Sequence, residues 1–222
     1  MFQLSLLHLL DWVSTIGFAA SGAVLAREQH RSLGISVAYA VLTAVGGGTL
    51  RDLLLGQPIF WVASPEYVLF AISTGTVVAL LFDVAHLTRR QFGWLDNVGL
   101  ATFTVIGTQA GLLQTVGLAT LGLSPLMGLM TAVGGGCLRD LLSQRRPITL
   151  RHPRYWVASW IGGTVFSVLQ VAHIMPCCAM VVAIALTLLL LPNSVRALVS
   201  LVSHGLGMPV SRRGLRHKGL QR

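Results

Sequence analysis

Long apolar runs dominate the chain, and short polar links separate them. Two of these runs, 68–81 and 180–191, contain no charged residue. A helix that crosses a bilayer needs about 20 mostly apolar residues. The pattern therefore predicts seven membrane-spanning helices, at residues 9–26, 33–55, 66–86, 95–114, 122–142, 155–174 and 177–203. The last contains Pro192 and Arg196, so it is either one kinked helix or a span followed by an interfacial segment.

Composition supports this class of protein. Hydrophobic residues make up 54% of the 222 residues and charged residues 10%, whereas a soluble domain carries about 25% charged residues. We therefore expect an all-α polytopic membrane protein. The net charge of +9 does not indicate a nucleic-acid partner, because the basic residues lie in the short links.

The basic residues also predict an orientation, because they occupy every second link between spans. These are Arg27 and Arg31, then Arg89 and Arg90, then Arg145, Arg146, Arg151 and Arg154, and finally Arg212, Arg213, Arg216, Lys218 and Arg222. Positive links face the cytoplasm, so we expect the N-terminus outside and the C-terminus in the cytoplasm. The basic tail either sets topology with a weak attraction to anionic lipid, about 1 kcal/mol per residue, or serves specific lipid regulation.

One twelve-residue phrase occurs twice. Residues 43–54 read TAVGGGTLRDLL and residues 131–142 read TAVGGGCLRDLL, so eleven of twelve positions match. Further matches fall at similar spacings: Asp11, Phe18 and Gly22 with Asp96, Phe103 and Gly107, and 75–77 with 163–165. A repeat of three spans re-enters the membrane from the other side, which predicts inverted repeats typical of transporters and channels. We divide the chain into repeats at 1–90 and 91–175, with a seventh helix and tail at 176–222.

The glycine triplets are the first candidate site: Gly46, Gly47, Gly48, Gly134, Gly135 and Gly136, with Thr49 beside the first. Glycine costs about 1 kcal/mol in a helix relative to alanine. One interpretation is that the triplets break their helices to line a solute pathway, since irregular backbone in a membrane survives only inside protein or along a cavity. Close helix packing is an alternative. A phosphate loop is a third, although the phrase lacks the Gly-Lys-Ser/Thr ending.

Each glycine triplet precedes an Arg-Asp pair, which gives four more candidate residues. Arg51, Asp52, Arg139 and Asp140 are either buried ion pairs with a gating role or helix ends at the membrane interface. The identical repeat favours buried pairing. Asp11 and Asp96 each open a predicted span, where a helix N-cap is the simpler interpretation.

Enzymatic chemistry is not expected. The chain has no Ser-His-Asp arrangement, zinc spacing or paired catalytic carboxylates, so we expect no catalytic residue, metal or cofactor. Cys137, Cys177 and Cys178 form no spaced metal motif, and we expect no disulfide framework.

With two GGGxLRD phrases in a plan of three, three and one spans, the chain resembles the bacterial branch of the trimeric intracellular cation (TRIC) channel family. The same branch is also catalogued as an uncharacterised inner-membrane family and as a glycine transporter family. The resemblance implies a homotrimer in the bacterial inner membrane with one K⁺- and Na⁺-conducting pore per protomer. It also implies that the second and fifth helices kink at 46–48 and 134–136 and line that pore. The Lys-Glu motif of animal members is absent, so their lipid and voltage control is not expected here.

The sequence is compatible with three functional hypotheses. The chain is a passive conduit for monovalent cations, a carrier of a small amino acid such as glycine, or a non-transporting membrane scaffold.

Overall fold

The computed structural model describes residues 2–82, 89–117, 119–147 and 151–191. The described chain is helical, with α1 Phe2–Glu28, α2 Leu33–Leu55, α3 Phe60–Ala63, α4 Glu66–Leu81, α5 Arg89–Leu112, α6 Ala119–Leu142, α8 Arg154–Val171 and α9 Pro176–Leu190. The first six predicted spans overlap α1, α2, α4, α5, α6 and α8, with ends that differ by up to seven residues, and residues 83–86 of the third span lie outside the described residues. The seventh begins as predicted at α9, and its part beyond 191 lies outside the described residues, as does the basic tail. The four-residue α3 was not predicted.

The exposed surface of the bundle is apolar, as membrane lipid requires. Within the described residues, three helices are long and apolar enough to cross a membrane individually, namely α1 over Leu7–Glu28, α2 and α6. Large apolar side chains are exposed on the outer helices, for example Leu69 and Leu80 on α4, Val168 on α8 and Val181 on α9. Water would disfavour so large an apolar surface. The chain is therefore an all-α membrane protein.

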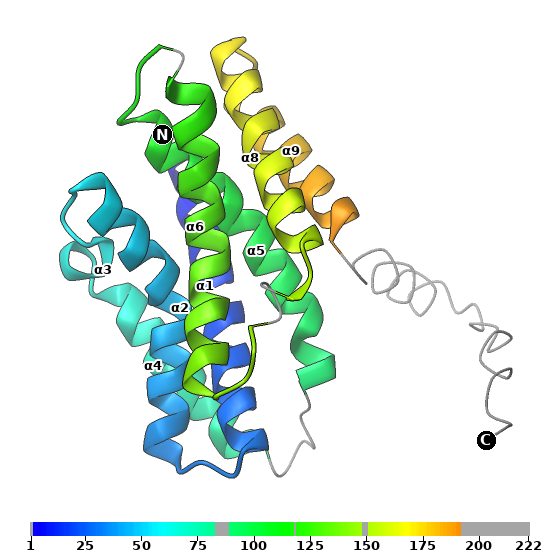
Figure 1. Ribbon diagram of the computed structural model, residues 1–222. Coiled ribbons are helices and arrows are strands. Elements are labelled where there is room, and N and C mark those ends of the chain that lie inside the picture. The colour runs from blue at the N-terminus through cyan, green and yellow to red at the C-terminus, as the bar shows by residue number, and fades with distance from the viewer. Residues whose placement is uncertain (1, 83–88, 118, 148–150, 192–222) are drawn as a thin grey trace, which may run out of the picture.

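The helices pack as two matching sets of three. In the first set α1 packs against α2 and α4, and in the second α5 packs against α6 and α8 in the same way. Two central contacts, α1 with α5 and α2 with α6, join the sets. In Figure 1, α2, α3 and α4 lie on one side of the bundle and α8 and α9 on the other. Helix α9 packs on α5 and α8 and has no counterpart in the first set.

Two equivalent phenylalanines mark the place where the sets meet. Phe18 of α1 and Phe103 of α5 stack with ring centroids 5.2 Å apart and planes 14° from parallel. Both are buried. Next to them the Ser14 and Thr102 hydroxyls contact each other. Contact between residues that match in the repeat is expected at a pseudo-two-fold axis, so the internal repeat is visible in the packing.

The expectation that the glycines break their helices is wrong. Helix α2 runs without interruption from Leu33 to Leu55, and α6 from Ala119 to Leu142, and each contains its triplet. A continuous helix satisfies its own backbone hydrogen bonds. The triplets therefore do not release the carbonyl and N–H groups that an interrupted helix would offer to a solute.

Candidate functional site

The glycine triplets let α2 and α6 touch backbone to backbone. A Cβ on Gly47 would overlap the Thr131 carbonyl oxygen, and a Cβ on Gly135 would overlap the Thr43 carbonyl oxygen. The two contacts are equivalent under the repeat. Small residues at a crossing permit this approach inside a membrane, so close packing describes these positions better than a helix break does.

The outer glycines of the triplets extend the crossing. A Cβ on Gly46 would lie 2.5 Å from Leu138 Cδ1, and a Cβ on Gly134 would lie 3.2 Å from Leu50 Cδ1. These contacts are again equivalent, because Leu50 and Leu138 match in the repeat. A Cβ on Gly134 would also lie 3.0 Å from Gly47 Cα, whereas a Cβ on Gly47 or Gly135 would overlap a carbonyl oxygen, so the middle glycines have the least room.

The third glycines differ between the two copies. Gly48 lies under the Phe60 ring of α3, where an added Cβ would be 2.5 Å from a ring carbon. Around Gly136 the nearest atom to an added Cβ is Arg139 Nη2, at 3.9 Å. The Thr49 hydroxyl already has two hydrogen-bond partners. It donates to the Val45 carbonyl and accepts a hydrogen bond from the indole N–H of Trp61, at 2.9 Å.

Both Arg-Asp pairs lie in the protein interior. The exposed fractions are 8% and 2% for Arg51 and Asp52, and 4% and 1% for Arg139 and Asp140. Arg51 donates from Nε and Nη2 to Asp52 Oδ1, at 2.8 and 2.6 Å. Arg139 donates from Nε to Asp140 Oδ1, at 3.0 Å. Each guanidinium therefore has its neighbouring carboxylate as counter-charge.

Helix α3 closes over the first pair. The backbone N–H of Phe60 donates to Asp52 Oδ2 at 2.8 Å, and the Phe60 ring lies 5.7 Å from the Arg51 guanidinium carbon. The same ring makes an edge contact with Tyr67, with centroids 5.1 Å apart. The short helix thus fixes the end of α2 against the start of α4.

Asp11 and Asp96 are not N-caps, contrary to expectation. Helix α1 begins at Phe2 and α5 at Arg89, so both carboxylates lie inside their helices. Asp96 binds Arg139 Nη1 through both oxygens, at 3.0 and 2.9 Å. Asp11 instead lies around one cavity with Arg51 and Tyr67. Carboxylates within a membrane helix need such partners because an isolated charge there is costly.

A cavity of about 290 Å³ opens in the first half of the molecule. It lies where α1, α2, α3, α4, α5 and α6 converge, next to the crossing. Its lining consists of His8, Asp11, Ala44, Gly48, Arg51, Phe60, Ala63, Ser64, Tyr67, Phe103 and Thr131. Two of the predicted site residues, Gly48 and Arg51, are among them.

Sequence reasoning missed several residues of this site. Asp11 was assigned to a cap, and Phe60, Tyr67 and Ser21 were not singled out. The 85-residue match of Asp11 with Asp96 was the available signal, since matched acidic residues in a membrane repeat indicate a shared role. Within the described residues no group of three His, Cys, Asp or Glu side chains could hold a metal ion.

Comparison with known families and proteins finds one matching family model and several related membrane proteins. The family model described as "Glycine transporter" matches residues 8–83 and 93–171. A Vibrio cholerae "UPF0126 membrane protein" is 37% identical over 166 residues, which cover 72% of this chain and 66% of that protein. The Escherichia coli "UPF0126 inner membrane protein YadS" is 37% identical over 162 residues, covering 72% of this chain and 77% of that protein.

Solved structures share the fold. A Rhodobacter sphaeroides orthologue of the "TRIC trimeric intracellular cation channel" is similar with a TM-score of 0.77 and 34% identity, over 88% of this chain and 98% of that one. A prokaryotic TRIC channel crystallised in 0.5 M KCl matches with a TM-score of 0.77 and 23% identity, over 90% of this chain and 99% of that one. At that lower identity the second match concerns the fold alone.

Proposed function

The chain belongs to the glycine transporter (UPF0126) family of membrane proteins, and from this premise we propose that it conducts monovalent cations, K⁺ and Na⁺, across the bacterial inner membrane. It acts as a homotrimer with one pathway in each protomer. The relative from Rhodobacter sphaeroides, described as a trimeric intracellular cation channel, supports this proposal. Residues 1–90 and 91–175 form the two repeats around the pathway, and 176–222 form the seventh helix and tail.

The observation that carries the proposal is the cavity beside the α2–α6 crossing. It reaches Gly48 and Thr131 at the crossing itself and is lined by the carboxylate of Asp11. A carboxylate at the mouth of a pathway attracts cations and disfavours anions. Along this route cations pass the crossing of α2 and α6 at the glycine triplets. A bend of these two helices widens the crossing. The ion pair of Arg139 with Asp96 acts as the gate at the opposite end.

A second candidate function is carriage of a small amino acid by alternating access. One specific observation favours it, namely that the two halves differ. The Asp11 side opens into a cavity, whereas on the other side Arg139 binds Asp96, Asp140 and Ser21 directly. A carrier with a cavity at one end and an ion pair at the other has this arrangement, and inverted repeats are frequent among carriers.

Recordings from purified protein distinguish the two candidates. In a planar bilayer with KCl on both sides, the channel proposal predicts discrete single-channel current steps. Vesicles containing the same preparation should then show no saturable uptake of radiolabelled glycine. Saturable glycine uptake without current steps would contradict the channel proposal and support the carrier proposal. Absence of both activities would support the interpretation as a non-transporting scaffold.

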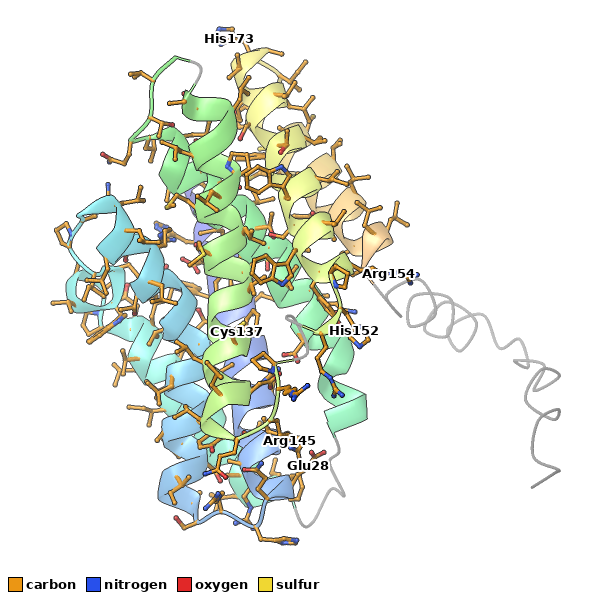
Figure 2. The ribbon with its side chains drawn as sticks, in the orientation of Figure 1. Glu28, Cys137, Arg145, His152, Arg154 and His173 are labelled. Atoms are coloured by element: carbon orange, nitrogen blue, oxygen red, sulfur yellow. The ribbon has the colours of Figure 1, made fainter. Side chains whose placement is uncertain are left out.

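We also propose that the N-terminus faces outward and the C-terminus the cytoplasm. Glu28 and Arg145 lie together at one end of the bundle, and His173 lies at the other (Figure 2). A hydrogen bond from Gln29 Nε2 to the Ser143 carbonyl, 3.2 Å long, joins the two basic links at the first end. Positive charges on links favour the cytoplasmic side.

Cysteine labelling tests this orientation. In a variant with the three native cysteines replaced, Gln144→Cys should react with a membrane-impermeant maleimide only after the cells are opened. Val116→Cys, which is 88% exposed at the opposite end, should react in intact spheroplasts. The reverse pattern would show that the basic links face outward and would contradict the proposed orientation.

A further inference from the structure

Helix α3 is a short element at the edge of the bundle (Figure 1), and few contacts hold it there. None of its four residues, Phe60–Ala63, is buried, and its main packing partners are α2 and α4. Gly56, with a positive φ of 65°, ends α2 before it, and Pro65 precedes α4 after it. A segment with little buried surface opens at a lower free-energy cost than the core does. Of the elements around the cavity, α3 is therefore the one that moves most easily.

The Phe60 side chain is the part of α3 that reaches the helix crossing. A Cβ on Gly48 would lie 2.5 Å from Phe60 Cε1, and 3.1 and 3.2 Å from two further ring carbons, so the ring lies directly on this glycine. The ring centroid is 5.7 Å from the guanidinium carbon of Arg51, and the ring edge contacts Tyr67. All four residues line the cavity. The ring therefore covers the α2 side of the crossing at the inner end of the cavity.

Two hydrogen bonds keep the ring in this position. The backbone N–H of Phe60 donates to Asp52 Oδ2 at 2.8 Å, and the indole N–H of Trp61 donates to the Thr49 hydroxyl at 2.9 Å. Both acceptors are side chains of α2. Helix α3 can therefore leave α2 without the loss of a backbone hydrogen bond inside either long helix that flanks it.

The second repeat lacks this aromatic arrangement. Its link at 148–154 contains no Phe, Trp or Tyr, whereas the matching link at 59–66 contains two aromatic residues, one of them Phe60. The nearest atom to an added Cβ on Gly136 is 3.9 Å away. The third glycine of the first triplet, Gly48, thus has a steric partner that its counterpart does not have. Its lack of a side chain makes room for the Phe60 ring.

We propose that Phe60 is the gate residue on this side of the pathway. In the present conformation its ring closes the way from the cavity to the crossing of α2 and α6, and an outward movement of α3 lifts the ring off Gly48. Apolar constrictions gate ion pathways because they exclude water from the narrow part. This inference rests on the proposed cation conduction and adds its regulation, on the side opposite the ion pair of Arg139 with Asp96.

Gly48→Ala tests the gate without changing Phe60. The new methyl group takes the position of the ring and displaces it, so the mean closed time of the K⁺ channel in planar bilayers should shorten at least about threefold. Gly136→Ala is the matched control, because an added methyl group there displaces no side chain, and its closed time should equal that of the wild type. A closed time in Gly48→Ala equal to or longer than that of the wild type would overturn the proposal.

Phe60→Ala gives an independent test, because it removes the ring but keeps the backbone N–H that binds Asp52. It should shorten the mean closed time by a similar factor. Gly48→Ala added to Phe60→Ala should then cause no further change, since no ring is left to displace. Two separate, additive effects would show that Gly48 and Phe60 do not act through the contact between them, and would overturn the proposal.

Hydrogen–deuterium exchange of the full-length protein in nanodiscs follows α3 without measuring conduction. The peptide 57–64 should exchange at least about threefold faster in Trp61→Phe, which loses the hydrogen bond to Thr49, and in Gly48→Ala. Trp160→Phe is the control, because Trp160 lies on α8, is 42% exposed and is remote from α3 in sequence. Exchange equal to that of the wild type in both test variants would show that α3 is not released, and would overturn the proposal.

The gate and the proposed function fail in different ways. A wild-type protein that passes no K⁺ contradicts the proposed function, and the exchange measurement then still decides whether α3 is released from α2. A wild-type protein that conducts K⁺, with unchanged closed times in Gly48→Ala and Phe60→Ala, contradicts the gate alone.

Discussion

Gly135→Ala should destabilise the protein by on the order of 2–3 kcal/mol, whereas Gly136→Ala, one residue further along α6, should be neutral or stabilising. The added methyl group at Gly135 meets the Thr43 carbonyl oxygen of α2, and neither backbone can move without opening the crossing. At Gly136 the nearest atom is 3.9 Å away. Alanine there gains about 1 kcal/mol of helix propensity.

Thermal unfolding of the two purified variants, followed by tryptophan fluorescence, checks this result. Gly47→Ala is the matched variant on α2 and should resemble Gly135→Ala, because its methyl group meets the Thr131 carbonyl. Larger changes, Gly47→Leu and Gly135→Leu, should abolish transport. If the triplets acted through helix flexibility alone, Gly135→Ala and Gly136→Ala would have similar effects, and such equality would contradict the packing account.

Arg139→Met should be the most damaging single charge removal, with a loss of about 3–5 kcal/mol. It leaves the carboxylates of Asp96 and Asp140 without the guanidinium that binds both, and Asp140 is only 1% exposed. Removing one member of a buried pair costs more than the pair itself contributes, because the remaining charge stays buried.

The control for this variant is Arg145→Met, on the exposed link that follows α6. It should unfold within about 0.5 kcal/mol of the wild type, as surface changes usually do. Adding Asp96→Asn to Arg139→Met should recover part of the loss, since it neutralises one stranded carboxylate. A melting temperature for Arg139→Met equal to that of the wild type would show that the Asp96–Arg139 pair does not hold α5 against α6.

The helical plan was predictable from the sequence because lipid imposes a simple requirement. Each span needs an uninterrupted apolar stretch, and the twelve-residue repeat alone relates Gly47 to Gly135. The sequence does not predict helix α3, because four residues are too few to show a periodic pattern. The prediction of a helix break at the glycines is wrong. It rests on the low helix propensity of glycine and leaves out the backbone contact that the glycines permit where α2 crosses α6.

The partners of the charged residues were harder to predict. Neighbours in the sequence such as Arg139 and Asp140 are easily predicted to form an ion pair. The hydrogen bond from Arg139 to Asp96 joins residues 43 positions apart and has no such signal. The sequence predicts helix caps at Asp11 and Asp96 because each stands at the start of an apolar run, yet helices α1 and α5 begin several residues before them. The cavity depends on Phe60 and Tyr67 folding over the end of α2, and no pattern along the chain contains that arrangement.

The central claim is that cations enter through the cavity bounded by Asp11 and Arg51. Its most direct test is the K⁺ current of a Ser64→Cys channel, free of native cysteines, before and after a cationic methanethiosulfonate reagent is added. Ser64 lines the cavity, whereas Val62, two residues earlier in the chain and 65% exposed, does not line it and serves as the control position. The account predicts that modification removes most of the current in Ser64→Cys and none in Val62→Cys. An unchanged current in a fully modified Ser64→Cys channel would contradict it.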